Sequence, residues 1–555
     1  MPSTVDLLPH AHERRISPCH SKQAQINRLA PKCLPRTARF AARLLILCLG
    51  LCALAHGQET GKPLAPLRAP TATGPLRRNP ANPRYFTDGS GKAIYLTGSH
   101  TWSNLMDRGT LHPPQVPFDY SAYMKWMVAR NFNFMRLWTA ELTDSADTND
   151  VDENVVAMPW KWMRTGPGYA NDGGLKFDLA QFDQSYFDRV RARTITAGQN
   201  GIYVSVMLFN GYELQFETNP IDGDPYRGFN NINNIDCPGR CPTDSSQMSD
   251  AVWNIEKAYI RKVIDAVNDL DNVLYEVSNE SGSPFSDIWQ AKVISFVHQY
   301  EATKPKQHPV GMTFQYKGGS DLTLYRSAAD WISAGSHVPP SDGTKVIIND
   351  TDHAYGAGEL KKDGAIGQRN WVWENFTSGN NVAFMDPYLV VWPGRNAPEG
   401  KTADPKIGLK PDNFYAPIRD AMGMTLTYAH RMNLVAMTPQ PSLCSTHFCL
   451  TNPGAEYLVY QPYSGRFTVS LRAGTYQFEW LDLSANRISS SGVLSVPGGI
   501  HAFSPEFSGD AVLYLHLGTS RSPLASPSPP SGLCPKVLPV GARGQATTAR
   551  NISPK

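Results

Sequence analysis

The chain has 555 residues, 41% of them hydrophobic and 10% aromatic, which is enough to build the cores of two folded domains. The formal net charge of +3 comes from the ends: residues 1–57 hold eight Lys or Arg against two Asp or Glu, and residues 519–555 hold five Lys or Arg and no acid. Without this +6 and +5 the central part has a charge near −8, which argues against a nucleic-acid partner.

Residues 1–57 are typical of a secretory signal peptide with an extended basic region. Three arginines within residues 36–43 precede an apolar run, residues 44–55, that is short for a membrane span and is followed by small residues. Cleavage is expected after Ala55 or Gly57. The sequence therefore predicts a secreted or periplasmic protein that is not attached to a membrane after cleavage. A Pro-rich linker is expected over residues 58–83.

Residues 84–435 alternate between strand and helix patterns. The apolar, β-branched runs predict strands over Ala93–Thr97, Phe132–Trp138, Ile202–Phe209, Val273–Ser278, Pro309–Phe314, Asp330–Ala334, Lys345–Ile348 and Val382–Met385. Helical patterns cover Tyr120–Arg130, Gln181–Gln199, Asp250–Leu270, Asp287–Thr303, Gln368–Thr377 and Asp412–Asn433. Such alternation predicts the α/β class and a (β/α)8 TIM barrel. Residues 339–343 leave no room for a full helix between strands six and seven.

Residues 436–518 have a different sequence pattern. Short runs of alternating polarity, separated by Gly, Pro, Asn and Ser, predict a small C-terminal antiparallel β-sandwich. Residues 519–555 are rich in Pro, Ser, Gly and Ala and are expected to be disordered. In an oxidising compartment, Cys237 with Cys241 and Cys444 with Cys449 are candidates for two disulfides.

Catalytic groups of a TIM barrel lie where its strands end. The residues that follow the predicted strands combine carboxylates, amides, imidazoles and aromatic rings. They are His100 and Trp102; Arg136, Trp138 and Glu141; Asn210 and Glu213; Asn279 and Glu280; Gln315 and Tyr316; His337; Asp350, Asp352 and His353; Asp386 and Tyr388. Aromatic rings stack on the C–H faces of sugars, and amides and carboxylates bind sugar hydroxyls. The rim therefore predicts a carbohydrate substrate.

Cleavage of a glycosidic bond requires one protonated carboxylic acid and one ionised carboxylate. Glu280, directly after strand four, is the first candidate. Strand seven lies across the barrel mouth, and Asp350 and Asp352 share a strand parity that lets both point inward. Glu276 lies inside strand four and is expected to be a buried, paired carboxylate beneath the site.

A family resemblance extends this interpretation. The segment Tyr275-Glu-Val-Ser-Asn-Glu280 resembles the YEIxNE signature of glycoside hydrolase clan A, best known from family 5 cellulases and mannanases. Residues 82–460 also resemble apiosidase-like bacterial barrels, whose C-terminal sandwich is sometimes labelled collagen-binding. The resemblance implies a retaining mechanism in which Glu280 is the acid/base and Arg136 keeps the nucleophile ionised. It also implies that Asn279 contacts the substrate 2-hydroxyl or the nucleophile.

The chain departs from the family at strand seven, where a Glu is usual. Aligning the following Tyr with Tyr355 puts Asp352 in the nucleophile's place, and Asp350 is the second choice. We expect sugar contacts from residues of the rim. They are His100, Trp102, Arg136, Trp138, Asn210, Asn279, Tyr316, His337, His353 and Asp386. The three histidines fit equally well as rim residues with purely structural hydrogen bonds.

Two alternatives remain open. The closely spaced Asp350 and Asp352 are a possible calcium pair, but no EF-hand-like loop follows, so we expect no metal and no cofactor. A non-catalytic protein that binds carbohydrate or extracellular matrix, with the barrel as a relic, is the rival to a hydrolase. It predicts saturable binding without new reducing ends.

Overall fold

The computed structural model describes residues 72–109, 117–145, 155–216, 223–239, 241–246, 248–282, 285–315, 318–351, 364–386, 388 and 415–518. The predicted signal peptide, most of the predicted linker and the predicted disordered tail lie outside these residues. The signal peptide, and with it export, therefore stays a prediction.

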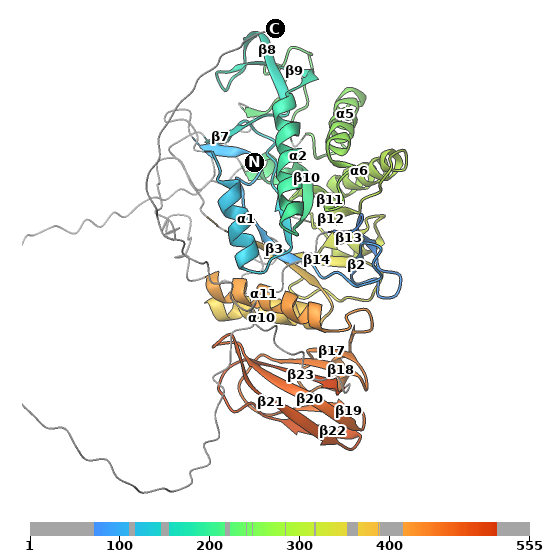
Figure 1. The fold of residues 1–555 in the computed structure, drawn as a ribbon. Helices are drawn as coiled ribbons and strands as arrows, with labels where there is room; N and C mark the ends of the chain where they lie inside the picture. The colour runs from blue at the N-terminus through green and yellow to red at the C-terminus, as the bar shows by residue number, and fades with distance from the viewer. Residues whose placement is uncertain are drawn as a thin grey trace, which may run out of the picture. The chain divides into compact units, whose positions relative to one another are not determined.

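Eight parallel strands close into a barrel (Figure 1). In chain order they are β3 (Thr97–His100), β5 (Phe134–Leu137), β10 (Tyr203–Asn210), β11 (Val273–Asn279), β12 (Val310–Thr313), β13 (Trp331–Ser333), β14 (Val346–Asp350) and β15 (Asn381–Met385). The last strand pairs with β3, and β3 pairs with β5, which completes the ring. The predicted TIM barrel is confirmed.

Helices alternate with most of these strands. They are α1 (Tyr120–Ala129), α2 (Gln184–Gln199), α3 (Gly211–Phe216), α5 (Asp250–Val267), α6 (Ser286–Glu301), α7 (Asp321–Arg326), α10 (Gly364–Thr377) and α11 (Ala416–Arg431). In α5 the Ser249 side chain accepts from the backbone N–H of Val252, and one apolar face that includes Tyr259 and Val263 is buried. Residues 334–345, between β13 and β14, hold no helix, as the prolines there predicted.

The first barrel strand begins later than expected. The prediction Ala93–Thr97 is wrong by about four residues, because Ile94 forms an antiparallel bridge with Phe86 in the preceding β2 (Phe86–Thr87). That pairing folds the N-terminal segment, with β1 (Arg77–Arg78), against the barrel. Phe86 and Leu96 share a buried cluster with Trp331 from β13, so this segment covers apolar side chains of the barrel strands.

The loop after β5 carries an insertion that the sequence did not predict. It contains β6 (Asp144–Ser145), β7 (Val155–Met158), β8 (Trp162–Tyr169) and β9 (Leu175–Phe182), and β7 also pairs with β4 (Asp107–Gly109). Its strands are antiparallel and half-exposed, and therefore lack the continuous apolar runs that marked the barrel strands. The insertion belongs to the carboxyl ends of the barrel strands, where sites form.

The C-terminal part consists of antiparallel sheets. Its strands are β16 (Thr438–Pro439), β17 (Cys449–Asn452), β18 (Glu456–Gln461), β19 (Phe467–Leu471), β20 (Gly474–Asp482), β21 (Arg487–Val496), β22 (Gly499–Phe503) and β23 (Ala511–Leu517). Six of them form one sheet, and β19 with β22 forms a second. Both sheets contribute to one buried cluster that includes Tyr457, Phe467 and Trp480. We call this part the C-terminal β-domain.

The C-terminal β-domain shares a core with the barrel helices. Tyr460 of β18 stacks on Trp373 of α10 at 6.3 Å between ring centroids, and both belong to the main buried cluster. Arg369 of α10 donates from Nε to Asp510 Oδ2 at 2.8 Å. A continuous apolar core with a buried ion pair indicates a structural support for the barrel rather than a loosely tethered module.

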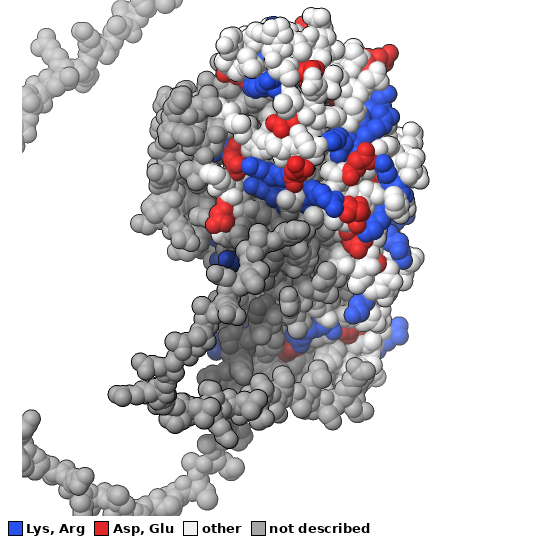
Figure 2. All heavy atoms as spheres, turned by 45° about the horizontal axis from the view of Figure 1, so that its top comes forward, with Lys and Arg blue, Asp and Glu red and all other residues white. Residues whose placement is uncertain are grey.

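Charges of both signs are interspersed on the face shown in Figure 2, without a broad patch of one sign. Within the described part of the chain, no helix combines the length and the apolar character needed to cross a bilayer.

Candidate active site

Arg136, near the end of β5, is the centre of a buried charge network at the carboxyl end of the barrel. Its guanidinium donates from Nε to Glu276 Oε2 at 2.8 Å, from Nη2 to Asn279 Oδ1 at 2.8 Å and from Nη1 to Asp350 Oδ2 at 2.6 Å. Arg136 is 3% exposed. One cation thus joins β5, β11 and β14, and the predicted burial and pairing of Glu276 are confirmed.

Asp350 has a second donor in His100, the last residue of β3. His100 Nε2 lies 2.9 Å from Asp350 Oδ2 and 3.2 Å from Oδ1, and both side chains are buried. Burial lowers the pKa of His100, although the neighbouring Asp350 acts in the opposite direction. A neutral imidazole that donates from Nε2 satisfies this geometry, and together with Arg136 it stabilises the ionised form of Asp350.

Trp138 forms one wall of this network. Its ring stacks on His100 at 5.3 Å with an interplanar angle of 7°, and the Arg136 guanidinium lies 5.2 Å from its ring centroid. Two buried nitrogens here, His100 Nδ1 and Trp138 Nε1, have no hydrogen-bond partner among the described residues. Such unmatched polar atoms in a buried site are places where a ligand or water adds a bond.

Glu280 follows β11 directly and is half-buried. Its φ is +43°, a left-handed conformation that is unfavourable for a residue with a side chain. The Gln215 side-chain amide of α3 donates to the Glu280 backbone carbonyl. Glu280 therefore leaves the strand end in an unusual direction that neighbouring groups hold in place.

The other predicted sugar contacts have different surroundings. Asn210 is buried, pairs in register with Asn279, and accepts at Oδ1 from the backbone N–H of Tyr212 at 3.3 Å. Trp102 is half-buried. The imidazole of His337 lies 3.3 Å from Glu374, so this histidine has a structural partner. Tyr316, Asp352 and His353 lie outside the described residues.

Asp386 has a buried ion-pair partner. Arg419 of α11 donates from Nε to Asp386 Oδ2 at 2.7 Å and from Nη2 to Oδ1 at 2.5 Å, and the two side chains are 1% and 0% exposed. A two-pronged ion pair of this kind ties α11 to the end of β15. The expected sugar contact of Asp386 stays a prediction, and the sequence did not show the ion pair because the partner lies 33 residues away.

One buried ion pair at the rim, between Lys161 and Glu141, was not predicted from the sequence. Lys161, with 0% exposure, donates from Nζ to Glu141 Oε1 at 2.7 Å, and the same oxygen accepts from the backbone N–H of Asn210 at 3.0 Å. Burial raises the pKa of Glu141 to about 7, against the opposing effect of Lys161. A lysine between Trp160 and Trp162 was the sequence signal, because a cation flanked by large apolar rings is placed for burial.

The cysteines divide into a bonded pair and a thiol pair. Cys237 and Cys241 form a disulfide. Cys444 and Cys449 are buried free thiols, which corrects the second predicted disulfide. Hydrogen bonds from Cys449 and Thr446 lower the pKa of the Cys444 thiol to about 6. Within the described ranges no group of three or more His, Cys, Asp or Glu is placed to hold a metal ion.

Comparison with solved structures finds proteins with a similar fold. One structure titled "Glycoside hydrolase" is 12% identical over 81% of this chain and 98% of its own, with a TM-score of 0.51. A glycoside hydrolase family 5 protein from Bacteroides vulgatus is also 12% identical, over 81% of this chain and 95% of its own, with a TM-score of 0.51.

The chain has a glycoside hydrolase fold. No protein-family model and no curated protein matches the sequence. At 12% identity the likeness establishes the architecture of a barrel followed by a β-rich domain, and chemistry has to be argued from the site itself.

Proposed function

We propose that the protein is a secreted glycoside hydrolase that cleaves glycosidic bonds in a polysaccharide or oligosaccharide by a retaining mechanism. The observation that carries this proposal is the placement of Asp350 against Arg136 and His100, on β14, three strands around the barrel from the β11 end that carries Asn279 and Glu280. A carboxylate held ionised and a second acid at the rim are the two groups that this chemistry requires.

Asp350 is assigned as the nucleophile in preference to Asp352. Arg136 Nη1 and His100 Nε2 lie 2.6 and 2.9 Å from Oδ2 of Asp350, and we assign the attack on the anomeric carbon to this carboxylate. Two donors favour the charged carboxylate before the reaction and release it as a leaving group in the second step. The aspartate is one methylene shorter than the glutamate of the related family, so the sugar would have to approach β14 closely.

Glu280 is assigned as the acid/base. It would donate a proton to the leaving glycosidic oxygen as Asp350 forms the glycosyl–enzyme bond, and would then take a proton from the water that breaks that bond. Asn279, whose Oδ1 accepts from Arg136, would contact the sugar beside the reacting carbon. The half-buried Trp102 would supply an aromatic surface for stacking on the sugar.

The test is to screen the purified mature protein against polysaccharides and aryl glycosides for new reducing ends. We expect cleavage that keeps the anomeric configuration, as seen by NMR of the first product. Glu280→Gln should lose activity on unactivated substrates by at least about a hundredfold, whereas the exposed Asp188→Asn on α2 should not. Binding of a polysaccharide without any cleavage would favour the non-catalytic alternative.

A further inference from the structure

Helix α3 is the structural neighbour of the proposed acid. It begins at Gly211, immediately after β10, and its Gln215 side chain reaches the next strand end, where the amide donates to the Glu280 carbonyl. The registration of Asn210 with Asn279 places α3 beside residues 280–282. This contact joins side chain to main chain, so it acts on the backbone of Glu280 and leaves the chemistry of its carboxyl unaltered.

The backbone at this point needs support. A φ of +43° at a glutamate is less stable than extended backbone, so contacts around it must hold the conformation. The hydroxyls of Ser278 and Ser281 are hydrogen-bonded across Glu280, and Thr313 donates to the Ser278 carbonyl. These bonds fix both sides of the turn, and Gln215 binds its centre.

The packing around the turn has no spare room. A Cβ at Gly211 would lie 2.4 Å from Ser281 Cα, and a Cβ at Gly282 would lie 2.0 Å from Gln215 Oε1. Glycine is therefore required at position 211 for α3 to approach the backbone of the turn, whereas a Cβ at position 282 would displace the Gln215 amide. Gln215 is held against the turn by shape as well as by its hydrogen bond.

Helix α3 is itself anchored on its other side. Glu213 accepts from the backbone N–H groups of Glu141 at 2.6 Å and Leu142 at 3.0 Å, and also binds Arg108. The loop after β5, which carries the antiparallel insertion, is thus tied to the helix that carries Gln215. A rigid support of this kind is what a strained backbone needs in order to persist.

We propose that Gln215 is a positioning residue that fixes the backbone of Glu280, and so the direction of its carboxyl, for proton transfer to the leaving group. This inference rests on the proposed function. Without the amide donor the turn relaxes toward extended backbone, and the carboxyl moves away from the leaving oxygen. A displacement of about 1 Å reduces a positioned reaction by as much as a hundredfold.

The test compares Gln215→Met, which keeps the length of the side chain and removes the donor, with Gln299→Met on the exposed face of α6. For both variants, kcat/KM is measured on an unactivated oligosaccharide and on the 2,4-dinitrophenyl glycoside of the same sugar. The dinitrophenolate leaves without protonation, so it does not need Glu280 in the first step. We expect a loss of about ten- to a hundredfold on the oligosaccharide and less than about threefold on the aryl glycoside, with Gln299→Met unchanged.

Equal losses on both substrates, or no loss on either, would overturn the positioning role. A second measurement does not need activity: hydrogen–deuterium exchange of the peptide that covers residues 273–285 should be faster in Gln215→Met and unchanged in Gln299→Met. If the wild-type protein cleaves nothing, the proposed function fails. Unchanged exchange in Gln215→Met would then separately reject the support of Glu280 by Gln215.

Discussion

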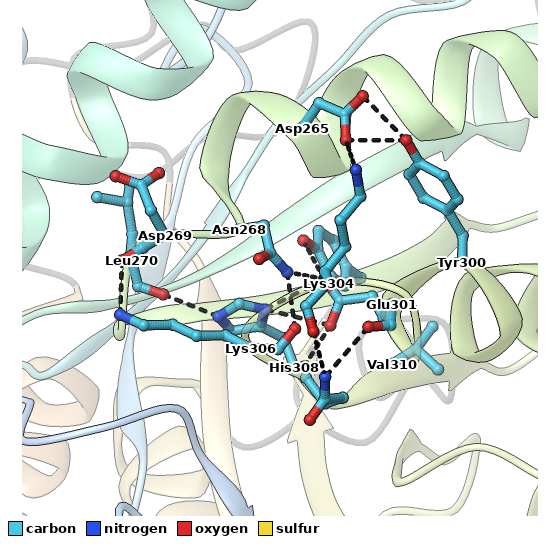
Figure 3. Close-up of polar contacts among 12 residues, drawn as sticks. Asp265, Asn268, Asp269, Leu270, Tyr300, Glu301, Lys304, Lys306, His308 and Val310 are labelled. Carbon is cyan, nitrogen blue, oxygen red and sulfur yellow. Dashed lines mark hydrogen bonds and ion pairs between the residues drawn. The ribbon is translucent and has the colours of Figure 1, made fainter.

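The barrel has a buried charge network at each end, and the two differ in how completely they are satisfied. At the carboxyl end, Arg136 joins Glu276, Asn279 and Asp350. At the amino end, Glu301 of α6 receives hydrogen bonds from Tyr275, Asn268 and His308 (Figure 3). Both networks are shielded from solvent and link several elements.

In the amino-end network, the carboxylate of Glu301 and the ring nitrogens of His308 all have protein partners. Glu301 Oε1 accepts from Tyr275 at 2.9 Å and from Asn268 at 2.9 Å, and Oε2 accepts from the His308 backbone N–H at 2.5 Å. The ring nitrogens of His308 face Glu301 at 3.2 Å and the Leu270 carbonyl at 2.8 Å. Each of these ring nitrogens has a protein acceptor, so this end is built for stability.

The carboxyl-end network is incomplete by contrast. His100 Nδ1 and Trp138 Nε1 have no partner in the described part of the chain, and Glu280, directly after β11, has a left-handed backbone conformation. Unsatisfied atoms and backbone strain lower stability and persist where function needs them. The comparison teaches that burial of charge does not by itself distinguish the two ends, whereas the unpartnered nitrogens of His100 and Trp138 do.

The largest expected effect is at the carboxyl end. Asp350→Asn removes the proposed nucleophile and should lower kcat by at least about a thousandfold. Circular dichroism should still show a folded protein, because Arg136 keeps Glu276 as a partner. In Asp350→Gly, which removes the side chain, added azide should restore cleavage of an activated glycoside and give a glycosyl azide of inverted configuration, because the small anion can attack in place of the carboxylate. Near-wild-type activity of Asp350→Asn would move the nucleophile to another residue, with Asp352 as the next candidate.

The amino end should respond in the opposite way. Glu301→Gln leaves the buried His308 without its anionic partner and should lower the free energy of unfolding by about 3 kcal/mol, measured by urea denaturation. The kcat of the folded fraction should stay unchanged, because this network lies at the far end of the strands from Asp350. A large fall in kcat at unchanged stability would contradict the division between the two ends.

A pH-dependent effect is expected from Asp224, in the segment after α3. Burial raises the pKa of Asp224 to about 8. Because this pKa lies above the ordinary value of 3.8 for an aspartate, the associated stability is present below about pH 4 and is lost as the pH rises through about 8. The free energy of unfolding of Asp224→Asn relative to wild type should therefore increase by up to about 1.4 kcal/mol per pH unit over this interval.

Urea denaturation at several pH values measures this difference directly. Asp188→Asn, at an exposed carboxylate of α2, is the matched control and should show no such trend. A flat difference between Asp224→Asn and wild type would show that Asp224 is charged in the folded protein.

The smallest effect tests an unused donor. Trp138→Phe keeps an aromatic face for His100 and removes the unpartnered Nε1, so the free energy of unfolding should change by no more than about 1 kcal/mol. If substrate uses this N–H, KM rises while kcat changes little. An unchanged KM would mean that Nε1 is not a ligand contact, and would weaken the argument from unused bonding capacity.

The sequence by itself was sufficient to predict the barrel and the position of Glu280 at the end of its fourth strand. Continuous apolar runs such as Val273–Ser278 are local signals, and their alternation with helical patterns leaves one main architecture. The end of the fourth strand then locates Asn279 and Glu280 at the rim. The absence of a helix between strands six and seven was equally local, because prolines caused it.

Only the tertiary structure decided which groups meet. Arg136 reaches Asp350 across 214 residues of sequence, and Arg369 reaches Asp510 across 141, distances over which no periodic pattern carries information. Arg419 pairs with Asp386, which the sequence did not predict, and Cys444 and Cys449 had disulfide spacing but are thiols. Spacing along a chain sets which face a residue lies on, whereas the partner on that face is set by how distant segments pack.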